Sequence, residues 1–248
     1  MTFSPHIIKE LLQTSDHQLQ ELKETYSRLP ATRCRRKTHC CSMLPEMTLV
    51  EALPVIRRLV EMAAAMRNRL IQKIIRYFFL NPVEITSCPF LEGRECLIYP
   101  DRFFGCRSYG LWSRARYETL AARDRNAKKH LQEQWKSLGV CLPKKVVDFQ
   151  VSYCLCVETN GLAVIDDKTL LKASDRIEAI SAHFSSWHQW FAQRYFSDLS
   201  FLLSALMFGY TEAVQMKFTL VRDMVNTENR TKLDRIIQEL PDLCAMLT

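Results

Sequence analysis

Residues 88–107 read CPFLEGRECLIYPDRFFGCR, and residues 33–41 read RCRRKTHCC. These two segments hold six of the ten cysteines of the chain, and a long stretch with helical periodicity separates them. Two short cysteine clusters far apart in sequence are what a folded metal site needs, because each contributes a turn of backbone that bears thiolates. The pattern therefore predicts that the two segments meet in the folded chain and that the fold is organised around them.

Length and composition indicate a helical globular chain. Its 248 residues are enough to bury a full core, and 48% hydrophobic with 25% charged residues is ordinary for a globular protein. Only six glycines occur, and strand-and-turn architectures use glycine freely. We expect a mainly α fold with a cysteine-rich, turn-rich insert and room for one short strand pair. One compact domain would comprise N-terminal helices (1–32), a cysteine-cluster metal-binding region (33–112) and a helical region (113–248).

Capping signals and apolar spacing give the expected helices. Ser4, Ser15 and Thr48 stand where helix starts are expected, the last two with Gln18 and Glu51 in capping-box positions. The apolar stripe after Thr48 predicts one helix to about residue 80. Further helices are expected over 113–138 and near 175–195, 197–208, 211–225 and 228–240. Residues 146–157 alternate as a strand does, although a buried helix also fits.

The expected compartment bears on how the cysteines are interpreted. The N-terminus shows no secretory signal and the chain has no run of about 18 apolar residues, so we expect a cytoplasmic protein without a membrane span. In a reducing compartment, clustered cysteines indicate metal binding or redox activity rather than disulfides. Six of them are the candidate ligands: Cys34, Cys40, Cys41, Cys88, Cys96 and Cys106.

Much of the net charge of +7 lies beside these cysteines. Nearby cations stabilise deprotonated sulfur. We therefore attribute this positive charge to the cysteines rather than to nucleic-acid binding. The basic residues concerned are Arg33, Arg35, Arg36, Lys37, Arg94, Arg102 and Arg107.

The motif details carry a resemblance to a known family. Residues 88–91 read CPFL, residues 96–99 read CLIY, and residues 102–107 read RFFGCR, with Phe103 where the family has proline. The first cluster has the form CxxCxxCC with Lys37 in the second cysteine position. Over about residues 33–110 the chain resembles the CxxCxxCC (YkgJ-like) cysteine-cluster family, whose members are zinc- or iron-chelating proteins. The resemblance implies a metal site, with one ligand replaced at Lys37.

The spacing favours iron over zinc. Structural zinc usually takes two compact Cys-x₂₋₄-Cys pairs, whereas seven and nine residues separate the cysteines of the second cluster. Iron–sulfur clusters accept wider spacing because their ligands attach to different irons. We therefore expect a 4Fe–4S cluster, and the alternative is Zn²⁺, including two zinc ions that share thiolates.

The sequence indicates the metal more clearly than it indicates the reaction. An iron–sulfur protein would serve electron transfer or cluster-based chemistry on a small molecule, and any enzyme activity would depend on the cluster. One alternative is a zinc-stabilised binding module with a structural metal. Another is an accessory protein that binds a partner through the basic side of residues 113–138. Nothing in the sequence identifies a substrate, a redox partner or an oligomeric state.

Several other residues have two interpretations. Cys154 and Cys156 could add a ligand or a redox couple, but a Cys-x-Cys pair in a strand is better explained as core. His39 is expected to face solvent or to support the site rather than bind metal. Trp187, His188 and Trp190 are better explained as a core cluster than as a pocket. Cys141 and Cys244 carry no expected role.

Overall fold

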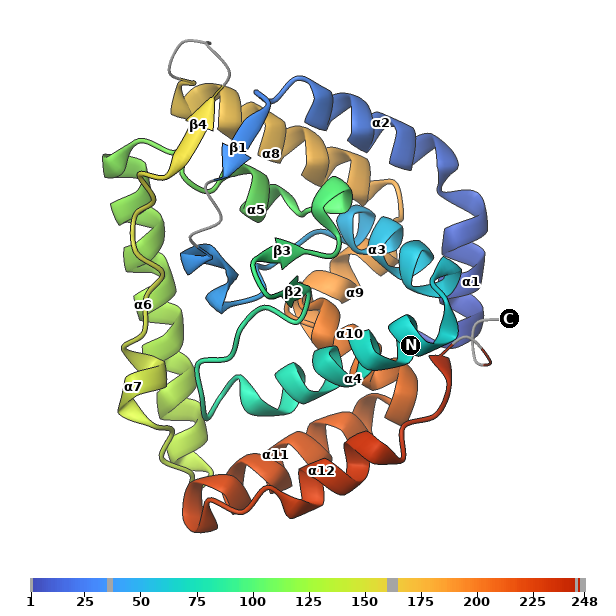
Figure 1. Cartoon of the computed structure of the whole chain (residues 1–248), viewed down its shortest axis with the longest axis vertical. Coiled ribbons are helices and arrows are strands. Elements are labelled where there is room, and N and C mark those ends of the chain that lie inside the picture. Colours follow the sequence, from blue (N-terminus) through green and yellow to red (C-terminus); the bar gives the residue numbers. More distant parts are fainter. Residues whose placement is uncertain (1, 35–37, 160–164, 244, 246–248) are drawn as a thin grey trace.

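A computed structural model gives the fold and describes residues 2–34, 38–159, 165–243 and 245, without the side chains of Arg33 and Cys34. In this part of the chain, twelve α-helices are joined by two 3₁₀ helices, irregular segments and two pairs of short antiparallel strands (Figure 1). The prediction of a mainly α fold is confirmed, and there is one more strand pair than expected. Lys37 and Cys244 lie outside the described residues.

The elements have the following bounds. The helices are α1 Pro5–Thr14, α2 Asp16–Ser27, α3 Leu49–Glu61, α4 Ala64–Leu80, α5 Phe104–Ser108, α6 Arg114–Ser137, α7 Lys144–Val147, α8 Asp167–Ala182, α9 Ser186–Arg194, α10 Leu199–Phe208, α11 Tyr210–Thr227 and α12 Thr231–Gln238. The 3₁₀ helices are η1 His39–Ser42 and η2 Tyr99–Asp101, and the strands are β1 Thr32–Cys34, β2 Leu91–Glu92, β3 Glu95–Cys96 and β4 Val157–Thr159.

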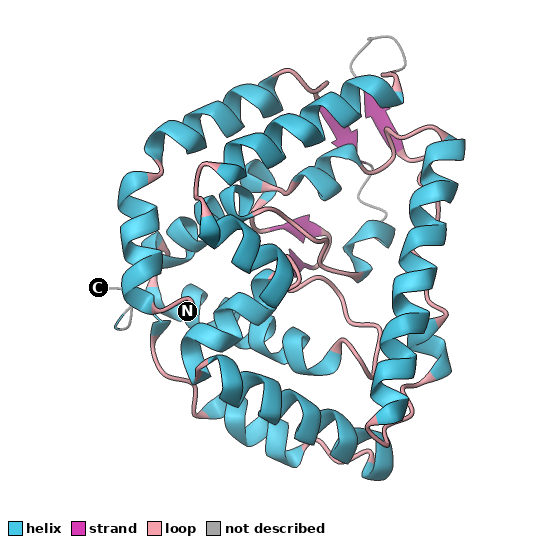
Figure 2. Cartoon of the chain, turned by 180° about the vertical axis from the view of Figure 1, so that it is seen from behind, coloured by secondary structure: helices cyan, strands magenta, loops and turns pink. Residues whose placement is uncertain are grey.

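Two helices form the centre of the core. Helix α10 is buried from Leu199 to Met207 and packs on α4 and α11, while α3 packs on α1, α2, α8 and α9. Figures 1 and 2 show α1, α2, α6, α8, α11 and α12 at the periphery, with α5, β2 and β3 inside that frame. The second cysteine segment therefore lies within the frame. None of the described helices is long and apolar enough to cross a bilayer.

The helix starts follow the capping signals at two of three positions. The Ser4 hydroxyl accepts a hydrogen bond from the Ile7 amide, with Pro5 in the first turn. Thr48 and Glu51 form the predicted capping box. Ser15 does precede α2, but its hydroxyl donates to the Leu12 carbonyl at 3.5 Å, so the predicted box with Gln18 is absent.

Two long predicted helices are each broken into a pair. The stripe from Thr48 to residue 80 forms α3 and α4, because residues 62 and 63 are extended. Arg67 is buried there and donates to the Met62 carbonyl at 2.9 Å, which satisfies an acceptor that the helix no longer pairs. The predicted helix 175–195 is interrupted between α8 and α9, where Ser185 has φ +52.

The ambiguous stretch 146–157 is neither a full strand nor a helix. Residues 144–147 form α7, an irregular segment follows, and only β4 is a strand. It pairs with β1 in antiparallel register, with Val157 opposite Cys34 and Thr159 opposite Thr32. The pairing places Val157 beside the backbone of Cys34 in the first cysteine segment, a contact that the sequence did not predict.

Candidate metal centre

The two cysteine segments meet in the structure. The Cys88 amide donates to the Cys41 carbonyl at 2.6 Å, across 46 intervening residues. Gly105 lies so close to the chain after the first segment that an added Cβ would stand 3.0 Å from Pro45 Cβ. The absence of a side chain at Gly105 thus permits close packing of the second segment on the first.

Helix α4 holds both segments. The Leu44 amide donates to the Tyr77 hydroxyl at 2.9 Å, which fixes the exit of the first segment. The Lys73 ammonium donates to the Leu91 carbonyl at 2.7 Å, which fixes the start of the second. The long apolar stretch between the clusters therefore acts as the scaffold that links them.

The second segment folds as a hairpin followed by two short helices. Strands β2 and β3 pair across a turn in which Gly93 has φ +58, and Cys96 lies opposite Leu91. Below them, the rings of Phe90 and Phe103 are buried with centroids 6.2 Å apart. Phe103 therefore belongs to the hydrophobic core together with Phe90.

Four thiols gather where the segments meet: those of Cys41, Cys88, Cys96 and Cys106. None of the eight cysteines with described side chains forms a disulfide. Burial raises the pKa of the Cys88 thiol, and the nearby Cys106, Cys96 and Cys41 raise it further. Burial likewise raises the pKa of Cys106 to about 12, with Cys96 and Cys41 as further causes. These interactions show that the four side chains lie within electrostatic reach of one another.

Among the described residues, no three cysteine, histidine or carboxylate side chains converge as ligands of one metal ion. Of the six predicted ligands, the structure thus brings four into one neighbourhood. Cys40 adjoins them through its hydrogen bond to Cys41, and the side chain of Cys34 is outside the description. His39 is exposed, as expected.

Cys41 differs from the other three thiols. A hydrogen bond with the Cys40 side chain, aided by the charge of Arg102, lowers the pKa of Cys41 to about 7. An ordinary cysteine titrates at about 8.5, so the Cys41 thiolate forms at the lowest proton cost. Cys41 is therefore the thiol best prepared to bind a soft metal first.

This difference predicts a pH dependence. In reduced, metal-free protein, the rate of alkylation of Cys41 by iodoacetamide should rise with a midpoint near pH 7, since the thiolate is the nucleophile. Cys88 and Cys106 should react only at much higher pH. Peptide mass spectrometry across a pH series measures each site separately.

Two variants of Cys40 form a matched pair for this test. Cys40→Ala removes the hydrogen-bond donor and should move the Cys41 midpoint up towards the ordinary value, whereas Cys40→Ser retains an O–H donor and should keep most of the shift. An identical Cys41 midpoint in wild type and Cys40→Ala would contradict this cause.

Glu51 is the supporting residue that the sequence reasoning missed in this role. Its carboxylate is buried and accepts hydrogen bonds from the Tyr26 hydroxyl at 2.6 Å and the Phe104 amide at 2.5 Å. The other oxygen accepts from the Thr48 amide at 2.8 Å. Glu51 thereby fixes the start of α5, which carries Cys106. The capping-box position of Glu51 was the only feature of the sequence that pointed to a structural role for this residue.

Two arginines lie near the thiols. Arg58 pairs with Asp101 at 2.8 Å, and the Arg102 guanidinium lies 3.8 Å from the Tyr99 ring centroid. Burial raises the pKa of Cys96, while Arg102 and Arg58 act in the opposite direction. These two cations are the local source of the thiolate stabilisation expected from the charge pattern.

Cys154 and Cys156 are not core residues, so the preferred interpretation of the pair is wrong. Both are half-buried, and neither belongs to the hydrophobic core of the described residues. The Cys156 amide donates to the Cys154 sulfur at 3.4 Å, and Leu155 between them is 83% exposed. Burial raises the pKa of Tyr109, and Cys40 and Cys154 add to this effect, so Cys40 and Cys154 both lie near Tyr109.

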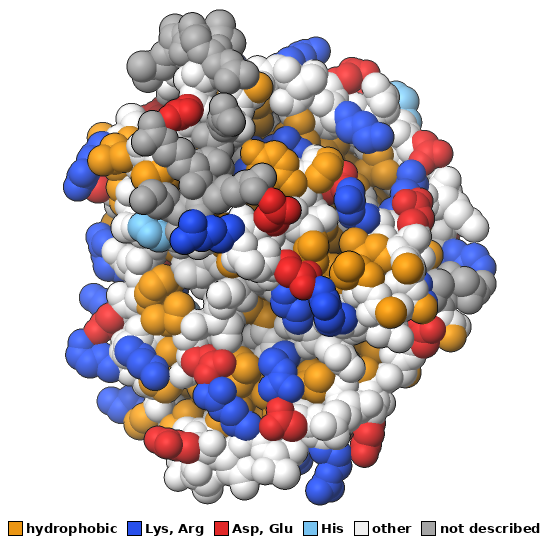
Figure 3. All heavy atoms as spheres, viewed as in Figure 1, with side chains coloured by type: hydrophobic (Ala, Val, Ile, Leu, Met, Phe, Trp, Pro, Cys, Tyr) orange, Lys and Arg blue, Asp and Glu red, His pale blue; other side chains and the backbone are white. Residues whose placement is uncertain are grey.

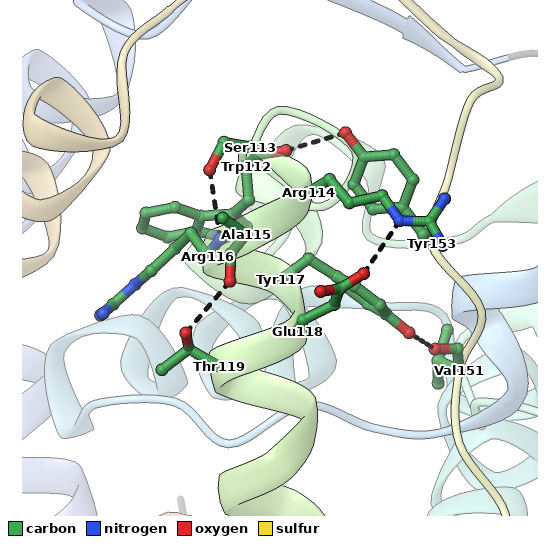
Figure 4. Close-up of polar contacts among 10 residues, drawn as sticks. All are labelled: Trp112, Ser113, Arg114, Ala115, Arg116, Tyr117, Glu118, Thr119, Val151 and Tyr153. Atoms are coloured by element: carbon green, nitrogen blue, oxygen red, sulfur yellow. Dashed lines mark hydrogen bonds and ion pairs between the residues drawn. The ribbon is translucent and has the colours of Figure 1, made fainter.

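Helix α6 uses several of its charges within the molecule (Figure 4). Arg114 pairs with Glu118 at 3.0 Å and lies 5.5 Å from the ring centroid of Tyr153. Lys128 donates to the Phe149 carbonyl at 2.7 Å. Outside the grey residues, positive and negative side chains are interspersed over the face in Figure 3. These contacts give the basic side of α6 a role in holding residues 149–153.

A serine–histidine–carboxylate chain occurs near α9 but cannot reach a substrate. His188 Nδ1 lies 2.9 Å from Ser181 Oγ, and Nε2 lies 3.0 Å from Glu178. Ser181 is completely buried and also accepts a hydrogen bond from the Val50 amide. The chain is therefore a structural link between α8, α9 and α3.

The neighbouring tryptophans belong to the core. Trp187 and Trp190 pack against the hydrophobic core, and the Trp187 ring centroid lies 5.0 Å from that of Phe3. The predicted core cluster is confirmed. Cys141 is exposed.

Comparison with family models, with curated proteins and with solved structures found no match to this chain. The resemblance to the CxxCxxCC family stays a prediction that depends on the motifs alone.

Proposed function

We propose that this chain is a metal-binding protein whose centre is held by cysteines of both segments, and that the metal is a 4Fe–4S cluster. The observation that carries the proposal is the meeting of the segments, which gathers the thiols of Cys41, Cys88, Cys96 and Cys106. Soft thiolates are the ligands that iron–sulfur clusters and zinc prefer.

The spacing of the cysteines supports a cluster over a single zinc ion. Structural zinc usually takes compact Cys-x₂₋₄-Cys pairs, whereas seven and nine residues separate Cys88, Cys96 and Cys106. The ligands of a 4Fe–4S cluster attach to different irons of a larger object, which accepts this wider spacing. The cationic Arg58 and Arg102 suit its anionic charge.

The role proposed for the cluster is electron transfer or chemistry on a small molecule. The family pattern places a cysteine where this chain has Lys37, so one iron would lack a family ligand. Cys154, which lies near Tyr109 as Cys40 does, and Cys156 are the candidates to replace it. An iron that keeps an open position would supply Lewis-acid chemistry to a bound substrate.

Visible spectroscopy tests the proposal. Protein purified without oxygen should be brown, and its visible absorption should bleach on reduction, since iron–sulfur clusters are coloured and zinc is a d¹⁰ ion. A change of spectrum on addition of cyanide would indicate an open iron position. A protein that is colourless under anaerobic conditions would reject the iron–sulfur cluster.

A further inference from the structure

Two adjoining cavities open between the N-terminal helices and the second cysteine segment. The larger, of about 500 Å³, lies between α2, α3 and the turn at residues 100–107, and the smaller, of about 400 Å³, extends along residues 26–32. They share Tyr26, Ser27 and Arg107 in their walls. Each has the size of a site for a small organic ligand.

The smaller cavity is cationic. Arg102 and Arg107 are its only charged lining residues among those described, and neither forms an ion pair with a described carboxylate. Arg107 donates Nε to the Arg102 carbonyl at 2.7 Å and a terminal N–H to the Pro100 carbonyl. The buried Nε of Arg102 has no hydrogen-bond partner in the described structure. Two guanidiniums without carboxylate partners are suited to an oxyanion from outside.

The carboxylates of the larger cavity are already engaged or lie at its rim. Glu51 accepts hydrogen bonds from Tyr26, Thr48 and Phe104, and Asp101 pairs with Arg58. The third carboxylate, Glu61, is exposed. The walls of the two cavities carry five cations and three carboxylates. Arg57 and Arg58 are already paired with Asp16 and Asp101, so the positive charge available to a ligand comes from the other three cations. The cations are Lys23, Arg57, Arg58, Arg102 and Arg107.

Aromatic rings hold the two guanidiniums in place. Arg102 lies 3.8 Å from the ring centroid of Tyr99, and Arg107 lies 4.2 Å from that of Tyr26. A guanidinium stacked on a ring still presents N–H groups at its edge, where a carboxylate or phosphate binds. Apolar side chains complete the walls, including Leu19, Leu22, Leu29, Pro30 and Pro54.

We infer that the joined cavities bind a small organic molecule through a carboxylate or phosphate group, held by Arg102 and Arg107, with its apolar body against the leucines and prolines. Arg102 also acts on the thiols of Cys41, Cys96 and Cys106. The ligand site thus lies beside the proposed metal centre. Binding itself needs no metal. Only the use of this molecule as a substrate of the cluster rests on the proposed function.

Calorimetry with two anionic probes and one neutral probe tests the site. Benzoate and phenyl phosphate represent the two anion classes, and benzamide is the uncharged analogue of benzoate. At millimolar concentrations, we expect at least one anion to bind wild-type protein, and benzamide to bind about tenfold more weakly, because a charge-assisted pair is lost. The stronger anion identifies the preferred group. Equal binding of benzoate and benzamide, with no binding of phenyl phosphate, would overturn the inference, as would no binding of any probe.

Arginine variants locate the binding. Arg102→Gln should weaken anion binding at least about tenfold. Arg222→Gln, on α11 and away from both cavities, should leave it unchanged. Arg107→Lys is the second variant. It retains the positive charge but loses the planar guanidinium with its paired N–H donors, so it should bind the anion more weakly than wild type. Circular dichroism verifies folding of each variant. Wild-type affinity in both Arg102→Gln and Arg107→Lys would contradict the site.

The same titration with metal-free and anaerobically purified protein separates the two proposals. If both preparations bind the anion and neither contains metal, the proposed anion site is supported and the proposed iron–sulfur cluster is rejected. Metal without anion binding rejects the cavity alone.

Discussion

Single serine variants of Cys88, Cys96 and Cys106 are expected to lose most of the metal that the wild-type chain retains. Each residue contributes a thiol to the neighbourhood where the two segments meet. Serine preserves size but replaces a soft thiolate with a hydroxyl that binds iron and zinc poorly. Because a metal site forms only in the folded chain, its loss should also lower the yield of folded protein. Elemental analysis of anaerobically purified variants measures the effect.

Cys141 provides the control for this experiment, and Cys41 provides a fourth test variant. Cys141 is exposed and stands apart from the cluster, so Cys141→Ser should retain the wild-type metal content. Cys41→Ser should behave like the three central variants, because Cys41 is the readiest thiolate. Full metal retention in Cys88→Ser, Cys96→Ser and Cys106→Ser would rule out the proposed centre.

Replacing Glu51 with alanine is expected to cause a large loss of stability. The Tyr26 hydroxyl and the Phe104 and Thr48 amides would lose a charged acceptor in a buried place. Buried donors without partners cost about 1–3 kcal/mol each, so we expect the free energy of unfolding to fall by at least about 3 kcal/mol. Urea denaturation of metal-free protein measures this without a contribution from metal binding.

Matched variants separate the buried network from the general effect of removing a carboxylate. Glu61→Ala, at the exposed end of the same helix, should change stability by no more than about 0.5 kcal/mol. Tyr26→Phe removes one of the hydrogen bonds and should cost about 1 kcal/mol. If Glu51→Ala unfolds at the same urea concentration as Glu61→Ala, the carboxylate does not anchor α5.

Local signals in the sequence were sufficient for most helices but not for their interruptions. Ser4 and the Thr48–Glu51 box mark helix starts correctly, because capping depends on residues within one turn. The break at Met62–Ala63 has no such signal. It is accompanied by tertiary contacts of Arg67, which pairs with Asp242 near the end of the chain.

The candidate site was likewise predictable only where a local sequence pattern indicated it. Clustered cysteines in two segments indicate a shared site, and the structure does bring Cys41 and Cys88 together. Strand β4 pairs with β1 although more than 120 residues of sequence separate them, and no local pattern predicts such a pairing. It places Val157, the neighbour of Cys156, opposite Cys34. The roles of Glu51 and Arg102 depend equally on distant partners, such as Phe104 and Cys41.

Iron and acid-labile sulfide analysis of protein purified without oxygen tests the central claim most directly. The account predicts comparable amounts of iron and sulfide, about four of each per chain, with little zinc. Colourless protein that contains stoichiometric zinc and neither iron nor sulfide would contradict the cluster and indicate a structural zinc site instead.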